Sequence, residues 1–208
     1  MYKNIFKRFF DIVLSGIAII ILSPVVLILF LTIYIDDPGP IFFTQKRVGK
    51  NKEHFKILKF RTMKVETPRD IPTHLLENPE QYITRVGKFL RITSLDELPQ
   101  IFNIFVGQMS IIGPRPALWN QFDLIEERDK YGANELTPGL TGWAQINGRD
   151  ELEIDIKAKF DGEYAEKLSF LFDAKCFFGT IVSVLKRDGV VEGIAQAENT
   201  QSKELANK

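Results

Sequence analysis

The longest apolar run of the chain lies near its N-terminus. Residues 12–35 are 24 consecutive positions without a charged side chain. As one straight helix they would rise about 36 Å at ~1.5 Å per residue, enough to cross a hydrocarbon core of about 30 Å. The run therefore predicts a membrane helix. A signal peptide fits less well, because the run is longer than the usual apolar core of such peptides and no small-residue cleavage motif follows it.

Two features bear on whether this helix spans the membrane. Ser23-Pro24 lies at the middle of the run, where proline should bend the helix and the serine hydroxyl could bond the freed carbonyl. Basic residues flank both ends of the run, and the positive-inside tendency places both flanks on the cytoplasmic side. They are Lys3, Lys7 and Arg8 before it and Lys46, Arg47, Lys50, Lys52, Lys56, Lys59, Arg61 and Lys64 after it. A re-entrant helix satisfies both features, but kinked spanning helices are common, so these residues alone favour spanning.

The remaining patterns predict an α+β chain with one compact domain and no internal repeat. Residues 41–45 and 54–60 predict a β-hairpin with a turn over 48–51. Helices are expected over 84–90, 94–106, 117–131 and 157–186, and loops over 64–80, 113–116 and 137–149. The polar residues after 188 are expected to be frayed.

The charge distribution is asymmetric although the formal net charge is zero. Residues 1–64 carry a net charge of +7, and the rest of the chain carries −7. The basic part indicates attraction to lipid headgroups or phosphate, and a solvated basic face explains it equally well. The single cysteine excludes an internal disulfide.

The segment 91–100 contains the adjacent carboxylates Asp96 and Glu97. Taken alone, Ser94-x-x-Glu97 is better explained as a helix-capping box. Pro99 favours a later helix start, and in either case Asp96 is expected at a helix N-terminus. The same geometry allows chemistry, because two carboxylates suit Mg²⁺, a helix N-terminus suits phosphate, and an aspartate can attack phosphorus.

An aspartate that attacks a diphosphate needs cations beside it. Arg91, Arg115 and Arg149 are candidates, although each alone could form an ordinary surface salt bridge. Arg115 is the most unusual, because two prolines fix its backbone. Lys59 and Arg61 should share one face of a strand, where a phosphate is a plausible partner. No Ser-His-Asp order, Cys-His cluster, Walker loop or dinucleotide fingerprint is present.

Six segments in order resemble the bacterial sugar transferases, the small monotopic phosphoglycosyl transferases. The resemblance covers roughly residues 1–188, and six ordered motifs are specific where one would be weak. The matching segments are the apolar run with Ser23-Pro24, Gly39-Pro40-Ile41-Phe42-Phe43 through Gly49, Lys59-Phe60-Arg61-Thr62-Met63, Ser94-Leu95-Asp96-Glu97-Leu98-Pro99-Gln100, Gly113-Pro114-Arg115-Pro116, and Pro138-Gly139-Leu140-Thr141-Gly142 through Gly148-Arg149.

The resemblance implies an activity. Asp96 would attack the β-phosphate of a UDP-sugar, of an N-acetylated hexosamine type, and release UMP. Polyprenyl (undecaprenyl) phosphate would then take the sugar phosphate from Asp96. Glu97 would support Mg²⁺, with Asp161 assisting at the metal. Arg91, Arg115 and Arg149, with Lys59 and Arg61, would hold phosphates.

The resemblance also implies a place in the cell. The helix would bend at Ser23-Pro24 and return to the cytoplasmic face of the bacterial plasma membrane. Residues 1–37 would form this re-entrant anchor, 38–188 the catalytic domain with interfacial helices, and 189–208 a flexible tail. The bilayer and the two substrates are the expected partners, a homodimer is possible, and nucleic acid is not expected.

The chain departs from the family pattern at two places. Lys52 stands where many members have glycine, so Asn51 is expected to take the turn conformation. Residues 157–160 lack the usual aromatic-acidic pattern, which weakens the role given to Asp161. Two other functions remain open, a membrane-bound Mg²⁺-dependent nucleotide-sugar pyrophosphatase and a non-enzymatic membrane scaffold.

Overall fold

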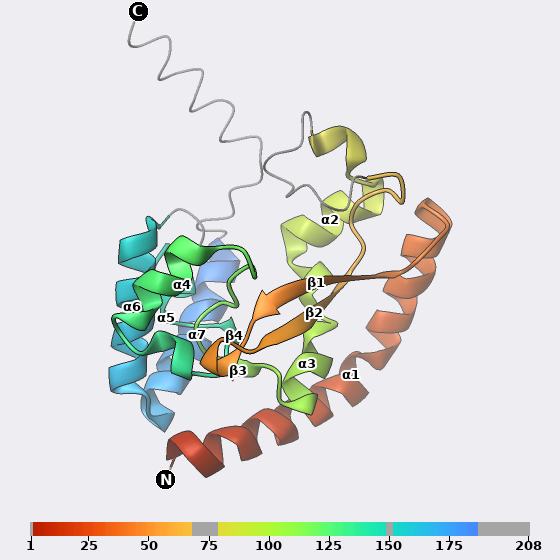
Figure 1. Ribbon diagram of the computed structural model, residues 1–208. Helices are drawn as coiled ribbons and strands as arrows, with labels where there is room; N and C mark the ends of the chain where they lie inside the picture. The colour runs from red at the N-terminus through yellow and green to blue at the C-terminus, as the bar shows by residue number, and fades with distance from the viewer. Residues whose placement is uncertain (1, 68–78, 149–151, 187–208) are drawn as a thin grey trace, which may run out of the picture.

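The computed structural model describes residues 2–67, 79–148 and 152–186 (Figure 1). Helices and two small two-stranded sheets alternate along the described chain, which confirms the mixed α+β class. The helices are α1 (Lys7–Asp36), α2 (Arg85–Thr93), α3 (Gln100–Val106), α4 (Phe122–Asp129), α5 (Trp143–Ile146), α6 (Ile154–Lys167) and α7 (Phe170–Lys186), and the 3-10 turn η5 covers Leu95–Glu97. The strands are β1 (Phe42–Val48), β2 (His54–Phe60), β3 (Ser110–Ile112) and β4 (Gly139–Thr141).

Helix α1 is long, apolar and bent. In Figure 1 its first half runs along the bottom of the molecule and its second half turns upward along the right-hand edge. Pro24 lies inside the helix, and its missing N–H leaves the carbonyl of Ile20 free. The Ser23 hydroxyl donates to that carbonyl at 2.8 Å. By length and composition α1 can cross a membrane, because its most apolar window has a mean hydropathy of 2.9 and is only 11% buried.

Both ends of α1 nevertheless contact the same folded domain. Near its start, the Arg8 guanidinium donates to the carbonyl of Phe105 at the end of α3, at 2.7 Å. At its other end, the Asp36 carboxylate accepts from the N–H of Val86 in α2 at 3.0 Å, and Leu29 is buried in a cluster between α1, the hairpin and α2. Helix α1 therefore braces the domain from one side.

The predicted β-hairpin is confirmed. Strands β1 and β2 pair antiparallel with Phe42 opposite Phe60, and β1 continues to Val48, beyond the predicted end. Asn51 has φ 54° and Lys52 has φ 64° in the connecting turn. Asn51 thus takes the left-handed conformation that was expected of it, and Lys52 takes it as well.

Strand β2 is fixed against α3 by apolar packing and by one side-chain amide. Ile57 packs on Ile104 in a buried cluster. The Asn103 side chain accepts from the N–H of Leu58 and donates to the carbonyl of Lys56, both at 2.9 Å. The Asn103 amide thereby provides hydrogen-bond partners for the backbone of β2 along the edge that does not face β1. These contacts set the position of β2 relative to the turn that precedes α3.

Strands β3 and β4 form a short parallel pair that the sequence analysis did not predict. Residues 137–149 were expected to be a loop, and they contain β4 and the four-residue helix α5. Glycines permit the close approach of the two strands. A Cβ on Gly139 would lie 2.1 Å from the backbone nitrogen of Gly113, and a Cβ on Gly142 would lie 2.1 Å from the carbonyl oxygen of Gly113. The backbone that follows β3 is therefore packed directly on the backbone of β4.

Three helix predictions need correction. The helix expected over 94–106 is the turn η5 followed by α3, because Pro99 has no N–H to donate to the carbonyl of Leu95. Ser94, with φ 56°, ends α2. The helix expected over 157–186 breaks at Leu168, whose ψ of 108° is extended. Helix α4 is shorter than the predicted 117–131. The tail after 188 and most of the 64–80 loop lie outside the described residues, and the division at residue 37 stays a prediction.

Candidate active site

Asp96 and Glu97 lie in η5, the tight turn between α2 and α3. The turn begins at Ser94, a non-glycine residue in the left-handed region, which is an uncommon conformation that often marks functional segments. Ser94 makes no capping hydrogen bond, so the predicted capping box is wrong. The Glu97 carboxylate reaches Lys59 and Arg115 instead.

Lys59 approaches both carboxylates from β2. Its Nζ lies 2.7 Å from Glu97 Oε1 and 3.6 Å from Asp96 Oδ2. Lys59 continues the inward-facing alternation of Phe55 and Ile57 along the strand. The three charged side chains are 14–19% exposed, so they are mostly withdrawn from water, but open enough for a ligand to reach them.

Arg115 approaches Glu97 from the other side. Its Nη2 lies 2.9 Å from the same Oε1 that Lys59 contacts. The Gly113–Pro116 loop that carries Arg115 is held by neighbouring backbone, since Pro114 accepts from the N–H of Gly139 at 2.8 Å. The Arg115 side chain is 39% exposed, so it is partly open to solvent beside the dyad.

Arg91 belongs to the last turn of α2, five residues before Asp96. Its Nε donates to the Thr62 hydroxyl at 2.9 Å. A Cβ on Gly87 would lie 2.0 Å from the carbonyl oxygen of Thr62, so glycine at this position lets α2 approach the segment that follows β2. The positive charge of Arg91 acts on Asp96, where it favours the ionised carboxylate.

The two carboxylates have different acidities. Burial raises the pKa of Asp96, with Glu97 adding to the effect, while Lys59, Arg91 and Arg115 oppose it. Burial also disfavours ionisation of Glu97, but Arg115 and Lys59 outweigh it and hold its pKa below the usual range. Carboxylates whose environments separate their pKa values are typical of sites in which the two have different roles.

The predicted role of Asp161 at the metal stays a prediction, and the contacts of its carboxylate are with Arg128. The Arg128 guanidinium donates to Asp161 Oδ2 through Nε at 2.8 Å and Nη2 at 2.6 Å, in a buried pair that joins α4 to α6. Among the described residues, no three Asp, Glu, His or Cys side chains gather as a metal site. Asp161 Oδ2 is thus engaged by Arg128, whereas its Oδ1 is buried without a hydrogen-bond partner in the part of the chain that the structure describes.

Arg61, another predicted phosphate ligand, is placed differently from Lys59. Strand β2 ends at Phe60, so the expected shared face does not extend to Arg61, whose Nη1 lies 3.0 Å from Asp37 Oδ2. Arg61 thus fixes the end of α1, and phosphate binding by it stays a prediction. Arg149 lies outside the described residues.

The sequence analysis did not single out Asn103 and Thr62. Asn103 clamps β2 to α3, and Thr62 accepts from Arg91. The available signal for Asn103 was an amide within the mostly apolar run Ile101–Val106. Nothing in the pattern distinguishes Thr62 from an ordinary threonine near a strand end.

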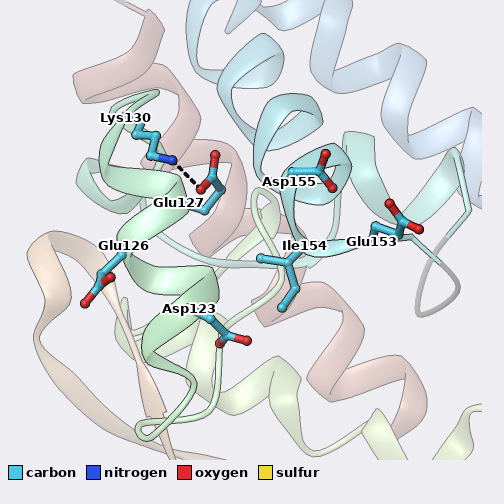
Figure 2. Close-up of a pocket in the computed structure, with 7 residues that line it drawn as sticks. All are labelled: Asp123, Glu126, Glu127, Lys130, Glu153, Ile154 and Asp155. Atoms are coloured by element: carbon cyan, nitrogen blue, oxygen red, sulfur yellow. Dashed lines mark hydrogen bonds and ion pairs between the residues drawn. The ribbon is translucent and has the colours of Figure 1, made fainter.

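A hollow on the described surface lies elsewhere, between α4 and the start of α6 (Figure 2). Carboxylates dominate its lining, and Lys130 is engaged with Glu127 at 2.6 Å. The lining residues are Asp123, Glu126, Glu127, Lys130, Glu153, Ile154 and Asp155. An acidic lining repels a diphosphate, so the candidate site remains at Asp96 and Glu97.

Comparison with known proteins identifies the family to which the chain belongs. The profile of the family described as bacterial sugar transferase matches residues 2–187. The chain belongs to the bacterial sugar transferase family. It is 40% identical over 186 residues to the UDP-glucose:undecaprenyl-phosphate glucose-1-phosphate transferase of Escherichia coli, covering 86% of this chain and 40% of that protein. It is 37% identical over 195 residues to the exopolysaccharide production protein ExoY of Sinorhizobium fredii, covering 87% and 86%.

A third relative is the undecaprenyl-phosphate galactose phosphotransferase of Salmonella typhimurium, 35% identical over 198 residues, covering 88% of this chain and 41% of that protein. The chain thus spans about two fifths of the length of several relatives and most of the length of ExoY. The part shared with the longer relatives contains the Asp96–Glu97 turn, Lys59 and Arg115.

Proposed function

We propose that this protein is a phosphoglycosyl transferase that moves a sugar 1-phosphate from a UDP-sugar to polyprenyl (undecaprenyl) phosphate and releases UMP. The observation that carries the proposal is the pair Asp96–Glu97 in a strained turn, with Lys59 and Arg115 beside it. This arrangement combines a carboxylate nucleophile with fixed positive charge for phosphate. The relatives' names, which specify sugar phosphate transfer to undecaprenyl phosphate, support it.

The proposed reaction has two displacements at the same phosphorus. A carboxylate oxygen of Asp96 attacks the β-phosphorus of the UDP-sugar, and the bond to the bridging oxygen breaks, so that UMP leaves with the electron pair. An oxygen of polyprenyl phosphate then attacks the phosphorus of the aspartyl phosphosugar. The bond to Asp96 breaks, which restores the carboxylate and gives the polyprenyl-diphosphosugar.

Fixed charges explain why a buried aspartate can perform this attack. Lys59 lowers the pKa of Asp96 against the effect of burial, which increases the ionised fraction that attacks. Lys59 and Arg115 also offer positive charge where a diphosphate would otherwise be repelled by two carboxylates. The Arg115 guanidinium, on a side chain that is partly exposed, is of a type suited to bind phosphate oxygens.

The residues fit the expected Mg²⁺. This ion takes one or two carboxylates and completes its shell with water and substrate phosphates. Glu97, whose pKa is held low, is ionised at neutral pH and offers hard carboxylate oxygens, of which Oε1 is already contacted by Lys59 and Arg115, and Asp96 is adjacent. Bound Mg²⁺ would neutralise charge on the diphosphate of the donor. Chelation is accordingly expected to abolish UMP release, with recovery when Mg²⁺ is added back.

The two ends of α1 support a re-entrant, monotopic placement on the cytoplasmic face of the plasma membrane. A straight spanning helix would put its ends on opposite sides of the bilayer, yet Arg8 and Asp36 contact one domain. The bend and the Ser23 hydroxyl bond beside Pro24 agree with this proposal. An N-terminal tag found outside the cytoplasm would refute it. A homodimer stays a prediction.

The identity of the sugar requires a panel of donors. The resemblance implied an N-acetylated hexosamine, whereas the names of two relatives specify glucose and galactose. The panel therefore contains UDP-glucose, UDP-galactose, UDP-N-acetylglucosamine and a deoxy derivative of the last. One donor is expected to give UMP release well above the others.

The test of the proposed reaction is UMP release by the full chain with Mg²⁺, with and without undecaprenyl phosphate. Sustained release is expected only with the lipid, and Asp96→Asn should abolish it while the protein stays folded by circular dichroism. Release at an equal rate without the lipid would instead support the pyrophosphatase. No release from any donor in the panel, with no effect of Mg²⁺, would support the scaffold and contradict the proposal.

A further inference from the structure

The start of α1 carries polar side chains that point into the folded domain. Lys7 Nζ lies 2.7 Å from Asp173 Oδ2 on α7, with only 9–11% of either side chain exposed. Arg8 donates to the carbonyls of Ile104 and Phe105 at the C-terminal end of α3, at 2.6 Å and 2.7 Å. These contacts tie an apolar membrane helix to two elements of the catalytic domain.

Asp11, one turn further along, contacts a third element. Its Oδ1 accepts from the backbone N–H of Ile111 at 2.9 Å and from the hydroxyl of Ser110 at 3.1 Å. Asp11 is 5% exposed and Ser110 is fully buried. A carboxylate is costly to bury for membrane anchoring alone, so its place against β3 calls for a specific role.

Strand β3 leads directly into the loop that carries Arg115. Gly113 follows its last residue and donates its N–H to the carbonyl of Thr141 at 2.8 Å, and Pro114 accepts from Gly139 at 2.8 Å. The connection from β3 to Arg115 is thus short and tied to β4 at two successive residues. We therefore expect a displacement of β3 to move the backbone that carries Arg115, whose guanidinium contacts Glu97.

We propose that Asp11 is a positioning residue that acts through β3 and Arg115, so that the membrane helix forms part of the catalytic apparatus as well as the anchor. Asp11 holds the register of β3 and thereby keeps the Arg115 guanidinium at the Glu97 carboxylate. The inference rests on the proposed function, because its effect is measured on phosphosugar transfer. A misplacement of about 1 Å at a reacting centre can cost on the order of 100-fold in rate.

The test compares Asp11→Ala, Asp11→Asn, Arg115→Ala and the Asp11→Ala/Arg115→Ala double variant, as full chains in nanodiscs, by UMP release with undecaprenyl phosphate and the best donor of the panel. Asp11→Ala should lower kcat/KM by roughly 10- to 100-fold. Asp11→Asn, which keeps a side-chain oxygen as acceptor, should recover most of this loss. In the Arg115→Ala background, Asp11→Ala should cost less than about threefold, because contacts that act through one residue are not additive.

Leu29→Ala is the matched control. Leu29 lies in α1 and is buried, but its cluster joins α1 to the hairpin, to α2 and to Leu95 and Leu98 beside the dyad, and contains no residue of β3. Leu29→Ala should lower the melting temperature. In the Leu29→Ala/Arg115→Ala double variant, the fold losses in kcat/KM of the two single variants should multiply. The inference about Asp11 would be overturned if the fold losses in kcat/KM of Asp11→Ala and Arg115→Ala multiplied fully in the double variant. It would also be overturned if Asp11→Ala had wild-type kinetics, and in either case the proposed function would stand. A wild-type chain that is inactive with every donor would overturn the proposed function instead.

Discussion

Replacement of Lys59 by methionine tests how the site ionises its nucleophile. The side chain keeps its length and loses its charge. Lys59 Nζ lies 3.6 Å from Asp96 Oδ2, where two unit charges interact by about 5 kcal/mol at an effective dielectric of 20 and by about 1 kcal/mol in water. Both side chains are partly exposed, so we take a value of about 2–3 kcal/mol between these limits, which is roughly a 30- to 150-fold change in the acid dissociation constant of Asp96.

The sign of the pH dependence follows from the causes that act on Asp96. Burial raises its pKa, and Lys59 is the largest opposing influence. Removing Lys59 raises this pKa further, so the acid limb of kcat/KM, which reports the free enzyme, moves to higher pH. The deficit of Lys59→Met should therefore grow as the pH falls and shrink as it rises.

The assay is the initial rate of UMP release at subsaturating donor across the pH range, with Lys59→Arg as the matched control. Arginine keeps the positive charge, so its acid limb should stay near that of the wild type even if its rate is lower. A Lys59→Met enzyme whose deficit is the same at every pH, with an unmoved acid limb, would refute this explanation of how Asp96 is ionised.

Three further substitutions separate structural roles from catalytic ones. Asp161→Asn should cost about 3 kcal/mol of stability in thermal unfolding, because it breaks a buried pair with Arg128, and it should leave the Mg²⁺ concentration dependence unchanged; a shifted dependence would support the metal role. Gly87→Ala should destabilise by about 1–3 kcal/mol in thermal unfolding, since its Cβ would meet the Thr62 carbonyl, and an unchanged melting temperature would contradict this packing. Asn51→Gly should keep full activity and raise stability by up to about 1 kcal/mol, because φ is 54°; a loss of stability would show that the Asn51 side chain matters.

Local patterns predicted the parts of the fold whose stabilising contacts are close in sequence. The hairpin follows from alternation around a tight turn, and Asn51 was correctly expected in the left-handed conformation. The same reasoning placed Lys59 on an inward face. It misplaced Arg61 because alternation holds only while the strand lasts, and β2 ends at Phe60. Beyond that point the Asp37 carboxylate determines where the guanidinium lies.

The parts that were missed depend on distant partners. The three-residue strands β3 and β4 are joined by backbone contact between glycines that lie far apart in the chain, and so short a run has no periodicity to detect. Ser94 was expected to cap a helix, yet its left-handed backbone forms a turn that directs Glu97 toward Lys59. The position of Asp161 could not be predicted, because its buried partner Arg128 is 33 residues away.

The central claim is that Asp96 becomes covalently attached to the phosphosugar. The most direct measurement is the intact mass of the full chain after incubation with Mg²⁺ and the active UDP-sugar, without polyprenyl phosphate. We expect the mass of the chain to increase by one phosphosugar, and peptide sequencing should map the adduct to Asp96. The adduct should be absent in Asp96→Asn and should be lost from the wild type when undecaprenyl phosphate is added. An adduct that persists in Asp96→Asn, or a wild-type enzyme that turns over without any trapped adduct, would contradict the central claim.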